Sequence, residues 1–116
     1  MKKLLKTDRE RNIYLVKEFT TENGKRAIVL EFEWTHPIVT LPNHFCGYVE
    51  KSKDDNTKYY DNPDIEVHGG VTFESELPEL EGQFVGFDMA HLFDEKIENP
   101  LEYATIECEK LSKQMK

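Results

Sequence analysis

The chain has little cysteine and no long apolar run. Its two cysteines, Cys46 and Cys108, are too few for the disulfide scaffold of a secreted protein, and they form no closely spaced metal-binding pair. We therefore expect two free, buried thiols in a reducing cytosol. No stretch approaches the roughly 20 apolar residues of a membrane-spanning helix, and Met1–Leu5 lacks the apolar run of a signal peptide. These absences predict a cytoplasmic protein without a membrane segment.

Motifs of several enzyme classes are missing as well. The glycines match neither the phosphate-binding P-loop nor the dinucleotide-binding pattern. There is no Gly-x-Ser-x-Gly segment, so the usual elbow of a serine hydrolase is excluded. A cysteine nucleophile has no support beyond the nearness of His44 to Cys46 in sequence, because neighbours in sequence need not meet in space. We interpret His36 and His44 as ordinary loop or surface residues.

Positive charges are also outnumbered, with 15 Lys and Arg residues against 23 Asp and Glu residues. The formal net charge is −8, which repels phosphate backbones and argues against direct binding of nucleic acid. The basic residues cluster only near the start, between Lys2 and Arg11, where a frayed and solvated terminus is expected. The acidity serves solubility, and it also suits a basic partner such as a nucleic-acid-binding protein.

What is present predicts one α+β domain over residues 1–116. A chain of 116 residues is long enough to bury its own core. The elements below predict an antiparallel sheet of about five strands that packs against one C-terminal helix.

The clearest strand signal is a β-hairpin over residues 11–34. Asn23-Gly24 is typical of a two-residue hairpin loop, and it would pair Phe19 with Ile28 and Leu15 with Phe32. One face of this hairpin is then mostly apolar, as a half-buried antiparallel pair requires.

Three further strands are expected after the proline-containing connection at 35–43. They cover residues 45–50, 64–74 and 83–88, and Gly69-Gly70 predicts a bulge or bend in the second. Residues 51–63 are polar and predict a surface loop, and residues 75–82 predict an acidic turn region.

The last element is a helix over residues 99–115. Asn99 is a favourable N-cap, and Pro100 is suited to the first helical position. An apolar stripe follows at spacings of three and four residues, which predicts packing against the sheet. The stripe consists of Leu101, Ala104, Cys108, Leu111 and Met115.

One group of residues has the chemistry of a metal site. Asp88, His91 and Asp94 recur at three-residue spacing, and His68 precedes Gly69-Gly70. If residues 88–94 form a turn or short helix, this spacing puts all three on one side. If the strand with His68 also lies beside residues 83–88, two imidazoles and two carboxylates can converge, a set that suits Zn²⁺ or another divalent ion. Alternatively, Asp88 caps a turn and His91 is a hydrogen-bonded core residue.

The segment 45–94 resembles a family of small, mostly uncharacterised proteins encoded by phages and prophages. The resemblance rests on Gly47-Tyr48-Val49, on the segment from Glu66 to Phe73 with its His68-Gly69-Gly70, and on the segment from Gly86 to Asp94. The terminal helix, with Glu107-Cys108-Glu109, is similar too. The resemblance singles out His68, Asp88, His91 and Asp94. The family often has Cys at Met89, Gly at Phe93 and His-Pro at Lys53-Asp54.

The resemblance implies an anti-defence protein of the anti-CRISPR type, or a host-takeover protein, in the cytoplasm of the bacterial host. Such proteins bind a host protein stoichiometrically, and an acidic surface suits a basic nucleic-acid-binding effector. The metal, with zinc favoured, would then be structural and closed by four protein ligands. The alternative is a small metal-dependent hydrolase or nucleotide-processing enzyme, in which His68, Asp88 and His91 leave one metal position open to water. A third interpretation is an accessory domain without metal.

Overall fold

The computed structural model describes residues 2–8, 10–35, 38, 42–89 and 97–116. Its elements are, in chain order, β1 (Lys3–Thr7), β2 (Arg11–Thr20), β3 (Arg26–Trp34), β4 (His44–Glu50), β5 (Phe73–Leu77), β6 (Leu80–Asp88) and α1 (Pro100–Gln114). The strands form one antiparallel sheet in the order β1-β2-β3-β4-β6-β5. The predicted α+β fold with a single C-terminal helix is confirmed, with six strands in the described part of the chain.

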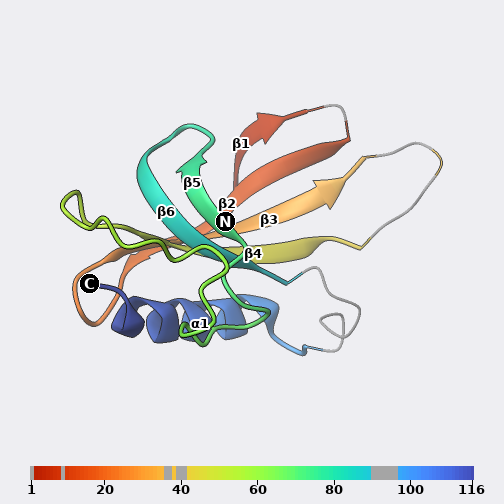
Figure 1. Cartoon of the computed structure of the whole chain (residues 1–116). Coiled ribbons are helices and arrows are strands. Elements are labelled where there is room, and N and C mark those ends of the chain that lie inside the picture. Colours follow the sequence, from red (N-terminus) through yellow and green to blue (C-terminus); the bar gives the residue numbers. More distant parts are fainter. Residues whose placement is uncertain (1, 9, 36–37, 39–41, 90–96) are drawn as a thin grey trace.

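The sheet curls away from the helix. Figure 1 shows α1 beneath the sheet, while the β1–β2 and β5–β6 hairpins rise on the other side. The helix contacts β3 and β4, the two central strands. The central strand β3 is buried on both faces, since Ala27, Ile28, Val29 and Leu30 are all inaccessible to solvent. The sheet therefore separates two apolar clusters. The helix-side cluster lies between the sheet and α1 and includes Val29, Val49, Phe87, Cys108 and Leu111; the concave cluster lies on the other face and includes Ile13, Leu30, Phe32, Cys46 and Tyr48.

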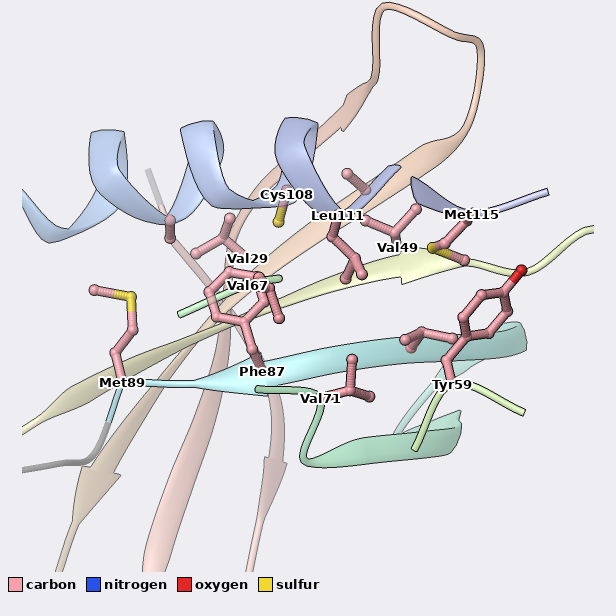
Figure 2. Close-up of a cluster of buried hydrophobic side chains, with 13 residues drawn as sticks. Val29, Val49, Tyr59, Val67, Val71, Phe87, Met89, Cys108, Leu111 and Met115 are labelled. Atoms are coloured by element: carbon pink, nitrogen blue, oxygen red, sulfur yellow. The ribbon is translucent and has the colours of Figure 1, made fainter. Parts of the chain in front are cut away.

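The helix-side cluster confirms the predicted apolar stripe. Figure 2 shows Cys108 and Leu111 of α1, and Met115 just after the helix, pointing towards the sheet and Phe87. Ala104 is also buried, and Leu101 is partly buried against the same cluster. The helix begins as expected, because the side chain of Asn99 accepts a hydrogen bond from the amide of Glu102 and Pro100 occupies the first turn.

The hairpin formed by β2 and β3 is confirmed, but its predicted register is wrong. Thr21 N–H donates to the Lys25 carbonyl at 2.7 Å, so the loop inside this hydrogen bond has three residues, 22–24, rather than the expected two. Gly24 adopts a φ of +87° there. The pairs are therefore Phe19 with Ala27 and Glu18 with Ile28, one residue away from the expected register.

A bulge at Val16 shifts the register again. Beyond it, Leu15 pairs with Leu30 and Ile13 pairs with Phe32. Odd-numbered residues of an unbroken β2 would all face one side, whereas the bulge sends Phe19 to the helix side and Ile13 to the concave side. Both clusters thereby receive apolar side chains from one strand.

Two strand predictions also need correction. The N-terminal residues form β1 rather than a frayed terminus, because β1 pairs with β2 and Leu5 packs against the concave cluster. The strand predicted at 64–74 begins only at Phe73, since Gly69 and Gly70 have positive φ and Gly70 N–H donates to the Val67 carbonyl, forming a turn. Residues 73–77 pair with β6, and the Thr72 N–H just before them donates to the Gly86 carbonyl of β6 at 2.9 Å.

The predicted loop at 51–63 is confirmed, and it is firmly attached to the sheet. Tyr59 is only 2% exposed and belongs to the helix-side cluster. The carboxylate of Glu74 in β5 accepts hydrogen bonds from the amides of Tyr59 and Tyr60 and forms an ion pair with Lys51 at 2.7 Å. This loop therefore extends the cover that α1 provides for the sheet.

Candidate functional site

A hollow of about 520 Å³ lies on the concave side of the curled sheet. Its walls are largely aromatic and aliphatic. Phe32 and Trp34 come from β3, Tyr48 from β4 and Phe73 from β5, and the ring of Tyr48 meets that of Phe73 edge-on with centroids 5.2 Å apart. Concave sites with such walls and a few polar groups are the usual places where proteins hold small molecules or partner side chains.

Three polar residues of the hollow, Arg11, His44 and Asp88, gather at one end of the sheet. Arg11 pairs with Trp34, Phe32 pairs with His44, and Cys46 pairs with Asp88. Strand order and register therefore place a row of side chains from β2, β3, β4 and β6 across this end. The ring of His44 stacks on Phe32 at 5.0 Å with an interplanar angle of 15°, and Trp34 lies 6.0 Å from it. We call Arg11, Phe32, Trp34, His44 and Asp88 the mouth row.

The charge of Arg11 is partly compensated within the chain. Its Nε donates to Oδ2 of Asp8 at 3.1 Å, and its guanidinium also lies over the Phe32 ring at 5.1 Å. The other charged side chains that line the hollow, Glu76 and Asp88, are carboxylates. The hollow therefore combines aromatic walls with a net acidic lining among the described residues.

Three ionisable groups of the hollow, on His44, Cys46 and Tyr48, are shifted by burial towards their neutral forms. Burial raises the pKa of the Cys46 thiol to about 12, and burial also raises the pKa of Tyr48 well above its ordinary value. Burial lowers the pKa of His44, although the carboxylate of Asp88 opposes this shift. A thiol with such a high pKa is a poor nucleophile, so the approach of His44 and Cys46 to Asp88 does not form an activated cysteine.

His68 lies on the other side of the sheet, against the helix. Its amide donates to Oε1 of Glu107 at 2.8 Å, and its Nδ1 is 2.9 Å from the Tyr103 hydroxyl. Glu107 is buried and Tyr103 partly buried, so both groups fix the turn at Gly69-Gly70 against α1. In the described part of the chain, His68 thus has a structural role.

Asp88 faces the concave side. It pairs with Cys46 of the concave cluster, while its neighbours Phe87 and Met89 belong to the helix-side cluster. The described contacts of His68 and Asp88 therefore lie on opposite faces of the sheet, because the expected strand at His68 is absent. His91 and Asp94 lie outside the described residues.

The four-residue metal site stays a prediction. Among the described residues, no group of three or more His, Cys, Asp or Glu side chains is arranged to hold a metal ion. The set that the sequence singled out needs His91 and Asp94 to be complete, and the described residues leave that set untested.

The mouth row was not predicted from the sequence. His44 was expected at a loop or the surface, but it lies in β4 and is half-buried against Phe32. The alternation of His44, Cys46 and Tyr48 along one strand is a signal that places all three on one face. Arg11 and Trp34 carry no such local signal, because the row depends on the pairing of four strands.

Fold and hollow together define a small α+β protein in which a curled antiparallel sheet packs on one helix and leaves its concave face accessible. Comparisons of the chain with protein-family models, with curated proteins and with solved structures found no significant match. The resemblance to phage-encoded proteins therefore rests on the quoted residues alone. Within the described residues, no helix is long and apolar enough to cross a membrane.

Proposed function

We propose that this protein acts by stoichiometric binding of a host protein, as an anti-defence protein of the anti-CRISPR type or a host-takeover protein, in the cytoplasm of a bacterial host. The partner is a protein with a basic surface, such as a nucleic-acid-binding effector. The observation that carries the proposal is the acidic, aromatic-walled hollow on the concave face of the sheet.

Two features of the hollow favour binding over catalysis. Aromatic side chains are enriched at the centres of protein interfaces, where they bury a large area at a low cost in conformational entropy. In addition, burial keeps the Cys46 thiol protonated, which leaves the hollow without an activated nucleophile among the described residues.

The overall charge supports a basic partner. A net charge of −8 accelerates encounter with a positively charged surface and disfavours competing contacts with nucleic acid. A nucleic-acid-binding effector presents such a surface, because it must attract phosphates. Occupying that surface would block the effector without any chemical step.

The proposal is tested by capturing the host partner on immobilised protein and comparing two variants. Trp34→Ala removes a ring from the mouth row, whereas Tyr60→Ala removes an exposed ring from the loop on the far side of the sheet. We expect the wild type and Tyr60→Ala to retain the same partner in a one-to-one complex, and Trp34→Ala to lose it. Retention by Trp34→Ala, or equal loss by both variants, would place the contact elsewhere.

A further inference from the structure

We propose that the hollow receives an arginine side chain of the partner protein, whose guanidinium stacks on the rings of the mouth row and faces the carboxylate of Asp88. This inference rests on the proposed function and specifies the chemistry of the contact. Its occupant is a basic segment of a protein, rather than a free metabolite.

The walls of the hollow suit a guanidinium. Arginine stacks on aromatic faces more readily than lysine does, because its cation is planar and weakly hydrated. The chain itself provides an example, since the guanidinium of Arg11 lies 5.1 Å from the Phe32 ring centroid. Phe32 is buried between its contacts with His44 and Arg11, so the partly exposed rings of His44 and Trp34 are the ones that the partner's guanidinium would meet.

The charges of the hollow favour a cation over an anion. Arg11 is paired with Asp8, whereas Asp88 and Glu76 contribute two carboxylates to the lining. Asp88 lies in the same row as the rings, at the end of β6. A carboxylate offers about four acceptor positions, so Asp88 can accept a guanidinium in addition to its contacts within the chain.

The size of the hollow suits one long side chain and its neighbours. A volume of about 520 Å³ exceeds what a single guanidinium fills. The aliphatic stem of an arginine would contact Ile13 and Leu77 while its head remains at the polar mouth row. A hydrophobic residue beside the arginine in the partner segment would fill the remainder.

Trp34 provides a direct readout, because it is the only tryptophan of the chain and lines the hollow. A short peptide with a central arginine is titrated against the full-length protein, and Trp34 fluorescence is recorded alongside calorimetry. The matched control peptide carries citrulline, which keeps the shape of arginine but lacks its charge. We expect the arginine peptide to change the fluorescence, and citrulline to weaken binding about five- to tenfold.

Two variants with the same change in charge locate the contact. Asp88→Asn removes the carboxylate of the mouth row, and Asp64→Asn removes an exposed carboxylate from the loop that precedes β5. Asp88→Asn should weaken the arginine peptide about fivefold, whereas Asp64→Asn should leave its affinity within a factor of about 1.5. If Asp88→Asn does not fold, Glu76→Gln serves instead, because that side chain is exposed on β5, and a two- to threefold loss is expected.

Four outcomes overturn the inference. They are the absence of binding at millimolar peptide, equal affinity for the citrulline peptide, equal losses in Asp88→Asn and Asp64→Asn, and binding without a change in Trp34 fluorescence. If one of these occurs while Trp34→Ala still abolishes the complex with the host partner, the proposed function stands and only the arginine contact fails. If the wild type captures no partner in a one-to-one complex, the proposed function itself fails. If Trp34→Ala and Tyr60→Ala both retain the partner, binding stands, but the hollow is not the contact and the arginine inference fails.

Discussion

Gly47 shows how little space remains between the sheet and the helix. A Cβ at this position would lie 2.4 Å from Cζ of Phe87 and 2.8 Å from Sγ of Cys108. Phe87 is 1% exposed and cannot move away without disturbing the cluster in Figure 2. Because Gly47 of β4 has no side chain, the Phe87 ring of β6 can occupy the space between β4 and α1.

We expect Gly47→Ala to lower the free energy of unfolding by about 3 kcal/mol, because overpacking forces shifts in a well-packed core. Urea denaturation measures this change. Gly70→Asn is the control, since no atom lies within 4 Å of its Cβ position and asparagine tolerates a positive φ; its cost should stay below about 1 kcal/mol. Equal costs for the two variants would contradict the packing argument.

The two cysteines are predicted to be unreactive in the folded protein. Burial raises the pKa of both Cys46 and Cys108 to about 12, and only the thiolate reacts with disulfide reagents. At pH 7.5 we expect no labelling by an aromatic disulfide within minutes, and two thiols per chain after unfolding in urea. Fast labelling of Cys46 in the folded protein would instead show that this thiol is accessible and reactive, and so able to act as a nucleophile.

At the scale of elements, the β2–β3 turn is joined to the end of α1 by polar side chains around the buried Ser112. Ser112 is fully buried, and its hydroxyl is 2.8 Å from that of Thr21. It also bonds to Asn23, whose amide donates to the Ser112 carbonyl at 3.0 Å. Asn23 therefore shapes the turn and also anchors the helix.

Replacing Ser112 by alanine should lower the free energy of unfolding by about 1–3 kcal/mol, because the buried hydroxyl of Thr21 and the side chain of Asn23 each lose a hydrogen bond. Ser52→Ala is the matched control, since its exposed hydroxyl only accepts from Lys25, and it should change stability by less than about 0.5 kcal/mol. Thermal unfolding of the two variants is compared with that of the wild type. Equal losses of stability in Ser112→Ala and Ser52→Ala would contradict a stabilising role for the contacts between Ser112 and the β2–β3 turn.

Elements whose signals are local could be predicted from the sequence, whereas pairings between distant segments could not. The N-cap at Asn99 and the apolar stripe of α1 depend on neighbouring residues, and both predictions are confirmed. The bulge at Val16 and the strand β1 depend on how apolar side chains are distributed between the two faces of the sheet. That distribution is set by packing in the assembled core, so no local pattern in the sequence predicts it.

The same distinction explains the candidate site. The metal prediction assumed that a strand at His68 lies beside β6, but the positive φ values of Gly69 and Gly70 end any extended segment there. The mouth row, in contrast, combines residues from four strands, with Arg11 and Asp88 far apart in sequence. No single motif predicts it.

At the scale of the whole molecule, two carboxylates that attach the loop at 51–63 should make stability sensitive to acid. Desolvation opposes ionisation of Glu74, but the Lys51 ammonium and the amides of Tyr60 and Tyr59 hold its pKa below the ordinary 4.5. Desolvation likewise opposes ionisation of Asp55, yet hydrogen bonds from Tyr59 and Thr57 hold its pKa at about 2, against an ordinary 3.8.

The pKa values of Glu74 and Asp55 are both depressed in the folded state. The stability that the two carboxylates contribute is therefore fully present above pH 4.5 for Glu74 and above pH 3.8 for Asp55, and it is lost as the pH falls through the folded-state pKa values. We expect Glu74→Gln to cost about 1 kcal/mol at pH 7 and progressively less below pH 4.5, as measured by urea denaturation across this range. A constant difference between wild type and variant down to pH 2 would contradict the role of the Glu74 charge.

The central claim, that the protein acts as a stoichiometric binder, is tested most directly by a dose–response measurement. The isolated host partner is held at a fixed concentration well above the dissociation constant, and its activity is recorded as this protein is added. The account predicts a linear decline that reaches completion at one equivalent. Complete loss of activity far below one equivalent, growing with time of incubation, would show turnover and contradict the claim.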